Sequence, residues 1–271
     1  MKKSVWMRYL ILGIVMAITI GPFIWMILTS FKTFEEAIRV PVTILPQMPT
    51  TEAYVHVWER FPFMSFYVNT FATLFFTIVI QLMICSMAAY AFARLRFPGR
   101  DVIFIVLLAL LMVPGQVFLL PNFLTIVRMD LADTVTALWL PRVFSAFGTF
   151  MLREFFKGIP KSLDEAAKLD GCSFFKIYLF VLLPLLKPAL ASLAILTAIA
   201  TFRDLMWPLI VNRSLNMMTL SAGLAMLIGE HQTHFPQVMA GGVMAMTPML
   251  ILFFIFQKQI IQGIATTGVK Q

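Results

Sequence analysis

The residues best placed to do chemistry in this chain lie in one polar segment, residues 153–184, within an otherwise apolar sequence. Ser162 is followed three residues later by Glu165, which is the spacing of a capping box at the start of a helix. Gly171 is placed to end that helix in a left-handed turn. The spacing therefore predicts a helix over residues 163–170, and what such a short polar helix can do is pack closely against another surface.

The predicted short helix carries further pairwise patterns. Asp164 and Lys168 are four residues apart and can form an ion pair on one face. Ala166 and Ala167 offer a small, smooth surface that another surface can approach closely. Because a helix of two turns is unstable alone in water, something must hold it. It packs either on the chain's own membrane domain or on a partner protein.

Ionisable residues also fall inside apolar segments. Arg203 and Asp204 lie near the outer end of one such segment, and Arg142 lies in another. A charged side chain within a membrane span is costly and usually faces protein or a cavity. Lysine and arginine near a span end can also extend to the interface instead. Arg142 is accordingly either a path residue or a partner for Asp133 or Asp204.

A second candidate path feature is the break predicted at Pro114 and Gly115, halfway along an apolar segment. Proline disrupts the helical hydrogen-bond ladder, and interrupted spans often mark substrate sites in transporters. Gln116 and Asn122 are then candidate path-lining residues. The alternative is a kink required only for helix packing.

Several other classes of function are not supported. The sequence has no G-x-x-x-x-G-K-[ST] phosphate loop. It shows neither a Ser/His/Asp arrangement nor metal-ligand spacing, and Cys85 and Cys172 are not expected to form a disulfide. We therefore expect no enzyme activity, no metal and no cofactor bound by the chain itself, and no nucleic-acid partner.

Composition places the whole chain in the membrane. Of its 271 residues, 60% are hydrophobic and only 13% are charged, against roughly 25% charged in soluble domains. A span needs about 20 mostly apolar residues, and six segments qualify. They are residues 9–30, 67–93, 102–126, 134–152, 185–208 and 238–257. The fold class expected is therefore all-α integral membrane, a single domain over residues 1–271 with six transmembrane helices.

The basic residues predict the orientation of those spans. In a six-span arrangement, 14 of the 21 Lys and Arg residues lie on the side that holds both termini, and only five lie on the other. Lys and Arg are enriched in cytoplasmic loops. We therefore expect both termini and the loop 153–184 to be cytoplasmic. The outer loop 31–66, which contains four prolines, is expected to be extended rather than helical.

The stretch "EAAKLDGCSFFKIYLFVLLP" resembles the EAA loop of ABC-importer permeases, namely E-A-A, three residues, G, nine residues, an aliphatic, one residue and L-P. The matching residues are Glu165, Ala166, Ala167, Gly171, Val181, Leu183 and Pro184. The family often has Ile where this chain has Val181. Other stretches, including "AYAFARLRFPGRD", "MVPGQVFLLPNF", "LMWPLIV" and the tail "GIATTGVKQ", are similar to the smaller permease of maltose-type sugar importers.

This resemblance implies a type I ABC-importer permease fold and a bacterial inner-membrane location. It implies that Glu165, Ala166, Ala167, Asp170 and Gly171 form a coupling helix seated on a cytoplasmic ATPase subunit. The substrate path is expected to include Gln116, Asn122, Arg203, Asp204 and Trp207. The family commonly has Trp-Asn before this Asp, whereas Phe202 and Arg203 stand here, so the role of that Asn does not carry over.

The resemblance also implies partners. They are a second, different permease subunit, two ATPase subunits that bind ATP and Mg²⁺, and an extracytoplasmic substrate-binding protein. The expected substrate is a sugar or oligosaccharide moved by alternating access, with glycerol phosphate or another polyol derivative as an alternative. An ion-driven secondary transporter and a non-transporting membrane scaffold are the rival functions.

Overall fold

The computed structural model describes residues 2–228 and 233–268 of the chain, and its regular elements there are helices. The C-terminal residues 269–271, part of the tail that resembles the family's, lie outside the described residues. The chain divides into two compact units. One comprises Met1–Met64 with Leu220–Leu252, and the other comprises Ser65–Thr219 with Phe253–Gln271. Each unit is described by itself.

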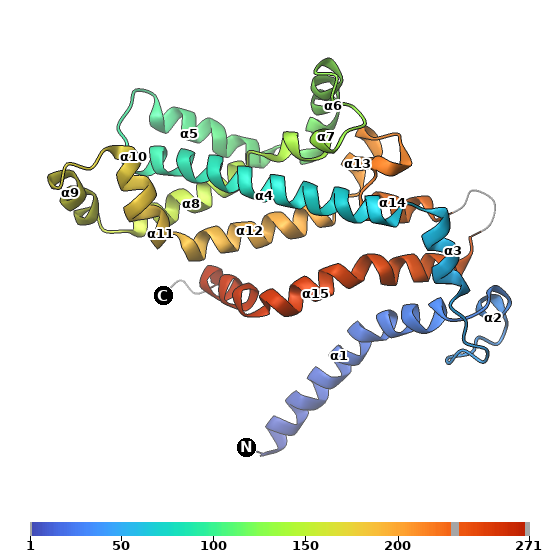
Figure 1. The fold of residues 1–271 in the computed structure, drawn as a ribbon. Helices are drawn as coiled ribbons and strands as arrows, with labels where there is room; N and C mark the ends of the chain where they lie inside the picture. Colours follow the sequence, from blue (N-terminus) through green and yellow to red (C-terminus); the bar gives the residue numbers. More distant parts are fainter. Residues whose placement is uncertain (1, 229–232, 269–271) are drawn as a thin grey trace. The chain divides into compact units, whose positions relative to one another are not determined.

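The first unit holds the N-terminal span and most of the loop 31–66. Its helices are α1 (Lys2–Ser30), α2 (Phe34–Ile38), α3 (Glu52–Arg60), α14 (Leu220–Met226) and the first part of α15 (Phe235–Gly268) (Figure 1). The expectation of an extended loop over residues 31–66 is wrong for α2 and α3. The four prolines of the loop all fall outside these two helices, three between them and Pro62 after α3, so they limit the helices without preventing them.

A carboxylate organises the non-helical part of that loop. Glu36 accepts hydrogen bonds from the Gln47 backbone N–H at 2.8 Å and from the Thr43 hydroxyl at 2.7 Å. These bonds favour the charged form and lower the pKa of the Glu36 carboxyl below its usual range. The loop is therefore folded around a charged group near neutral pH.

The second unit is built around one long helix, α4 (Phe63–Arg94), of 32 residues. Besides the last part of α15 and five short 3₁₀ or π segments, its α-helices in the described residues are α5 (Arg100–Ala109), α6 (Leu119–Arg128), α7 (Val135–Trp139), α8 (Ala146–Gly158), α9 (Ser162–Leu169), α10 (Phe174–Lys176), α11 (Leu183–Leu185), α12 (Lys187–Phe202) and α13 (Met206–Val211). Helices α9 and α10 lie at one end of α4, and α6, α7 and α13 lie at the other (Figure 1).

Two of the predicted spans, 9–30 and 67–93, are single helices long and apolar enough to cross a membrane, α1 and α4. Three more correspond to bent pairs of helices, with bends of 102° between Met112 and Gly115, 47° between Arg142 and Ala146, and 76° at Leu186. Counting each pair as one span gives up to five spans in the described residues. The predicted segment 238–257 lies in α15, whose Phe235–Ile251 part is a shorter apolar helix.

The structure differs from the predicted spans in where the helices end. The segment 185–208 is not one helix, because α12 ends at Phe202 and a turn precedes α13. The expected break at Pro114 and Gly115 is present and is the sharpest of the three bends. That a single domain covers residues 1–271 stays a prediction.

The break between α7 and α8 leaves backbone groups without helical partners, and side chains of α4 bind them. The Gln81 amide donates to the Arg142 carbonyl at 3.1 Å. The Ser145 carbonyl accepts from the thiol of Cys85 and from the Thr149 hydroxyl. Irregular backbone at membrane depth is tolerated where protein satisfies it in this way.

The main core cluster of the second unit lies at the α9 end of α4. It contains Cys85, Ala89 and Tyr90 of α4, packed against Leu152 and Phe156 of α8. Residues of the segment that follows α9 complete it, including Ile177, Tyr178, Leu182 and Leu186. The cluster therefore joins the polar segment 153–184 to α4 through buried apolar contacts.

Outside the spans, Asp133 ties two loops together at the opposite end of this unit. Its carboxylate accepts hydrogen bonds from the Ser214 hydroxyl and from the backbone N–H groups of Arg213 and Ser214. These bonds, the Ser214 hydroxyl first, lower the pKa of the Asp133 carboxyl. Asp133 is thus not the partner of Arg142, one of the two partners that the sequence left open.

Candidate coupling surface and membrane groove

Helix α9 begins at Ser162 and ends at Leu169, within one residue of the predicted 163–170. The predicted capping box is absent. Lys161 occupies the N-cap position, and no side chain caps the helix there. Because Ser162 is already the first helical residue, its hydroxyl is not placed to bind the first free N–H groups.

The end of α9 is as predicted. Gly171 has a φ of +77°, and its N–H bonds to the Lys168 carbonyl while the Cys172 N–H bonds to the Ala167 carbonyl, both at 3.0 Å. This pair of bonds is a Schellman motif, which requires a residue in the left-handed conformation at the Gly171 position. A glycine adopts that conformation without steric cost.

The spacing of Asp164 and Lys168 allowed an ion pair between them, but Asp164 pairs with another residue. It forms an ion pair with Arg94, the last residue of α4, with 3.2 Å between Arg94 Nε and Asp164 Oδ2. The two side chains are only 6% and 11% exposed. Two charges this far from water must be paired, so the ion pair fixes the position of α9 on the end of α4.

Further polar contacts extend this attachment along α4. Arg94 also donates to the Ile159 carbonyl at 2.7 Å, just before α9. The Tyr90 hydroxyl donates to the Phe174 carbonyl at 3.0 Å, just after it. Deeper in the unit, the hydroxyls of Ser86 and Tyr178 lie 2.8 Å apart. Successive turns of α4 therefore hold both the entry to α9 and the exit from it.

The opposite side of α9 is free of such contacts in the described residues. Leu163, Ala166 and Leu169 are exposed, and Leu169 has 89% of its surface accessible. Glu165 and Asp170 are exposed beside them, whereas Ala167 is buried. Of the two predicted alanines, Ala166 faces outward and Ala167 packs inward, so the outward surface is an apolar stripe flanked by carboxylates.

A second candidate surface lies in the membrane part of this unit. Two adjoining cavities, of about 480 and 400 Å³, share Arg142, Leu196 and Ala200 in their walls. We call them together the membrane groove. One wall is polar, with Gln81, Arg142, Thr197, Thr201 and Asp204, and another is apolar, with Phe144, Phe147, Leu193 and Leu196.

The polar wall of the membrane groove is tied together by side chains from three elements. Arg142 Nη2 lies 2.5 Å from Asp204 Oδ2, so Asp204 is the partner of Arg142. The Thr197 hydroxyl of α12 donates to the Gln81 side-chain oxygen. Gln81 thus connects α12 to the break after α7, and the charges of Arg142 and Asp204 offset each other.

The residues expected along the substrate path are not all brought together. Asp204 lines the membrane groove, and Arg203 lines it from an exposed position. Gln116 is exposed and Asn122 half-buried, and neither belongs to its lining. Trp207 is 3% exposed, packs against Ile126 and Leu138, and donates its indole N–H to the Ala137 carbonyl. Trp207 therefore lies in a packed cluster and not on the groove.

Sequence reasoning missed Gln81, Thr197 and the pairing role of Arg94. Gln81 could have been singled out from the sequence, because an amide in an otherwise apolar span is costly unless it has a hydrogen-bond partner. The partner of Arg94, Asp164, lies 70 residues away in the sequence. Nothing local identifies such a pair.

We predict that Asp164→Asn loosens α9, because it leaves the Arg94 charge buried without its counter-charge, a change that costs about 3–5 kcal/mol. Cys172 reports this, since its N–H forms the outer bond of the Schellman motif. Maleimide should label Cys172 roughly tenfold faster or more in the variant. Asp170→Asn, which neutralises an exposed carboxylate next to the same helix, is the control and should leave the rate unchanged. Equal labelling of the wild type and Asp164→Asn would show that the ion pair does not position α9.

Comparisons with known proteins agree with this architecture. A family model described as "Binding-protein-dependent transport system inner membrane component" matches residues 81–266. The arabinooligosaccharides transport system permease protein AraQ of Halalkalibacterium halodurans is 32% identical over 98% of this chain and 96% of its own length.

A second relative is the sn-glycerol-3-phosphate transport system permease protein UgpE of Pectobacterium atrosepticum, 31% identical over 85% of each chain. A chain from the crystal structure of a bacterial ABC transporter involved in the import of the acidic polysaccharide alginate superposes with a TM-score of 0.84, at 25% identity, covering 95% of this chain and 96% of that one. The fold is thus that of a type I ABC-importer permease, all-helical and integral to the membrane. The chain belongs to the family of binding-protein-dependent transport system inner membrane components, the permease subunits of ABC transporters.

Proposed function

We propose that this chain forms half of the translocation path of an ATP-driven importer for a sugar or oligosaccharide, and that α9 is its coupling helix. The observation that carries the proposal is the structure of α9 itself. It presents an exposed apolar stripe on one side and is held to α4 by a buried ion pair on the other. A helix built in this way can receive a displacement from a partner and pass it into the membrane unit.

The proposed partner at α9 is a cytoplasmic ATPase subunit. Leu169 and Ala166 would enter an apolar recess of that subunit, where burying an exposed leucine side chain gains about 1.5–3 kcal/mol. Glu165 and Asp170 would meet basic groups at the rim. Closure of two ATPase subunits on ATP would pull α9, and Arg94 would carry that movement into α4.

The remaining proposed parts follow from this arrangement. ATP and Mg²⁺ would be bound by the two ATPase subunits and not by this chain. A second, different permease would supply the other half of the path, and an extracytoplasmic binding protein would deliver the substrate. In a bacterial inner membrane, both termini and Cys172 would face the cytoplasm, so an impermeant thiol reagent should reach Cys172 only from that side.

The chemistry of the membrane groove supports a carbohydrate substrate. Sugars present hydroxyl groups on their edges and C–H groups on their faces, and the groove offers a polar wall and an apolar, partly aromatic wall to match. The relative AraQ is named for arabinooligosaccharides. Alternating access would expose this groove first to the outer side and then to the cytoplasm.

Glycerol phosphate is a second candidate substrate, supported by one observation. The pairing of Arg142 with Asp204 leaves Arg203 as an additional cation in the groove lining. A phosphate group could be attracted by that charge, and the relative UgpE is named for sn-glycerol 3-phosphate.

We predict that Glu165→Lys weakens association with the ATPase subunit, since it reverses a charge on the exposed rim of α9. Co-purification of the ATPase with the tagged permease should fall at least fivefold. Glu59→Lys, at an exposed position in α3, makes the same charge change in the outer loop and should have no effect. Undiminished co-purification with Glu165→Lys would remove this residue from the docking surface.

We predict that Gly171→Val uncouples ATP hydrolysis from uptake while the ATPase remains bound. A Cβ at Gly171 has open space, so the substitution acts through the φ of +77° and not through a clash. A β-branched residue resists that conformation, whereas asparagine tolerates it. Gly171→Asn should therefore retain most uptake per ATP hydrolysed, and Gly158→Val should retain it fully because Gly158 has open space and no positive φ. Equal coupling in the Val and Asn variants would contradict the conformational explanation.

We predict that Ala200→Leu reduces uptake at least fivefold, because it fills the membrane groove, whose two cavities share Ala200. Ala198→Leu makes the same change at a half-buried position of α12 outside the lining and is the control. The measurement is ATP-dependent uptake of a panel of oligosaccharides and of sn-glycerol 3-phosphate by the reconstituted importer. Normal uptake by Ala200→Leu would exclude the groove from the path, and uptake of no carbohydrate or polyol phosphate would contradict the substrate class.

A further inference from the structure

We infer that a groove between the end of α4 and α9 binds the phosphate headgroup of an anionic phospholipid. The groove encloses about 600 Å³. The loop after α4 contributes Leu95, Arg96 and Phe97 to it, and α9 with its N-cap contributes Lys161, Asp164, Glu165 and Lys168. We call it the headgroup groove. The inference rests on the cytoplasmic orientation in the proposed function.

The charges of the headgroup groove do not balance. Its lining has five basic side chains, Arg94, Arg96, Arg100, Lys161 and Lys168, against the two carboxylates Asp164 and Glu165. Arg94 is neutralised by Asp164, and Arg100 by Asp101. In the described residues this leaves Arg96, Lys161 and Lys168 facing Glu165 alone, so the groove attracts an anion.

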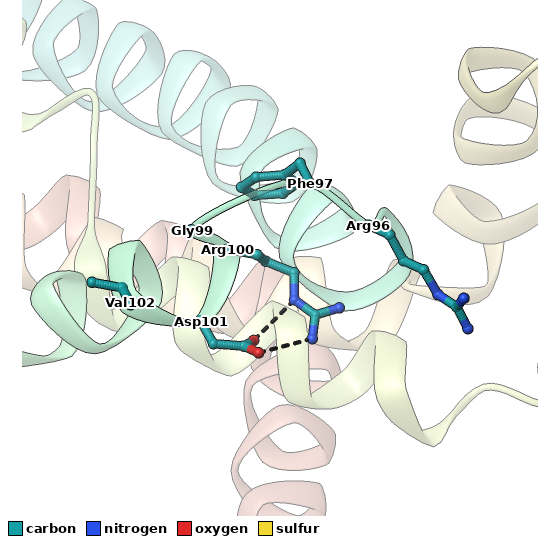
Figure 2. A pocket seen from close by; sticks show the side chains of 6 residues that line it. All are labelled: Arg96, Phe97, Gly99, Arg100, Asp101 and Val102. Atoms are coloured by element: carbon teal, nitrogen blue, oxygen red, sulfur yellow. Dashed lines mark hydrogen bonds and ion pairs between the residues drawn. The ribbon is translucent and has the colours of Figure 1, made fainter.

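The close view of the adjoining cavity shows how the cations divide between these roles. Arg100 and Asp101 face each other, with Arg100 Nε 2.9 Å from Asp101 Oδ1, whereas Arg96 extends away from this pair (Figure 2). This cavity, of about 440 Å³, shares Arg96, Phe97 and Arg100 with the headgroup groove. Arg96 is therefore available to a ligand in either cavity. Arg100 is already paired with Asp101, so the binding of an anion does not depend on it.

The surroundings favour a lipid over a soluble anion. The headgroup groove is walled by Tyr90, Ala93, Phe97 and Phe174 as well as by its cations. Directly after Arg100 and Asp101, α5 exposes Val102, Ile103, Ile105 and Val106. A phospholipid can thus place its phosphate among the basic residues and its acyl chains along the exposed face of α5. Basic pockets at the cytoplasmic ends of spans are suited to such headgroups.

The headgroup groove and the apolar stripe of α9 lie on different faces of that helix. Lys161, Asp164, Glu165 and Lys168 follow the i, i+3, i+4, i+7 spacing that places residues on one face and line the groove. Leu163, Ala166 and Leu169 do not line it. An ATPase on the apolar stripe therefore leaves Lys161 and Lys168 uncovered, with the Lys168 ammonium 5.3 Å from the centre of the Phe174 ring in the groove wall. A lipid held there would join the loop after α4 to the coupling helix.

The test is lipid binding to the purified full-length permease by native mass spectrometry, with phosphatidylglycerol and phosphatidylcholine titrated separately. Each Lys or Arg near an anionic lipid contributes about a fivefold gain in affinity. Arg96→Gln/Lys161→Gln should therefore bind phosphatidylglycerol about 30-fold more weakly than the wild type. Arg128→Gln/Arg213→Gln removes the same charge from exposed positions at the other end of this unit and should bind as the wild type does.

Three results would overturn the inference. They are unchanged phosphatidylglycerol binding in Arg96→Gln/Lys161→Gln, equal binding of phosphatidylcholine, and displacement of the lipid by millimolar inorganic phosphate, which would identify a soluble anion as the ligand. Binding needs neither ATP, an ATPase nor a transported solute. Absence of transport by the wild-type importer, with lipid binding intact, would therefore contradict the proposed function alone. Absence of phosphatidylglycerol binding by the wild type, with transport intact, would contradict this inference alone.

Discussion

The structure of the second unit depends on the ion pair between Arg94 and Asp164, since it joins the polar segment to the membrane helices. Both charges are nearly excluded from water, so separating them would leave each unpaired at a cost that neither helix can offset. Arg94 Nε and Asp164 Oδ2 lie 3.2 Å apart and form an ion pair without the geometry of a hydrogen bond. The attraction is therefore mainly coulombic, and it can persist through small rotations of α9.

Helix α4 extends the influence of that ion pair across the unit. Its 32 residues make it about 48 Å long. At the end opposite Arg94, Asn69 donates to the carbonyls of Asn216 and Met218. Midway, Gln81 binds the Arg142 carbonyl and the Thr197 hydroxyl. One continuous helix therefore contacts α9, the membrane groove and the loop that follows α13, and a displacement at one contact must be accommodated at the others.

A feature of this arrangement could be predicted from the sequence when neighbouring residues determine it, and could not when it depends on residues that only folding brings together. The turn at Gly171 and the break at Pro114 were predictable because one residue type determines the backbone there. The pairing of Asp164 was not, because its partner Arg94 is brought close only by folding, and the spacing instead favoured Lys168. Trp207, expected on the path, packs its large apolar ring against Ile126 and Leu138, and its place on the path stays a prediction. The membrane groove depends on the break after α7. Pro141 stands beside that break, but the apolar run over residues 134–152 favoured one span and hid the signal.

The break after α7 explains why the polar wall of the membrane groove needs a polar surface opposite it. Bending the segment at Arg142 frees backbone groups, and Gln81 and Cys85 satisfy them from one side, that of α4. The same bend brings Arg142 to Asp204 and leaves polar side chains lining a cavity. In a bilayer, a wall with Arg142, Asp204 and exposed Arg203 cannot remain in contact with lipid chains, because charged groups there are costly. The surface that faces this wall must therefore be water or protein, as the second permease subunit of the proposed assembly would provide.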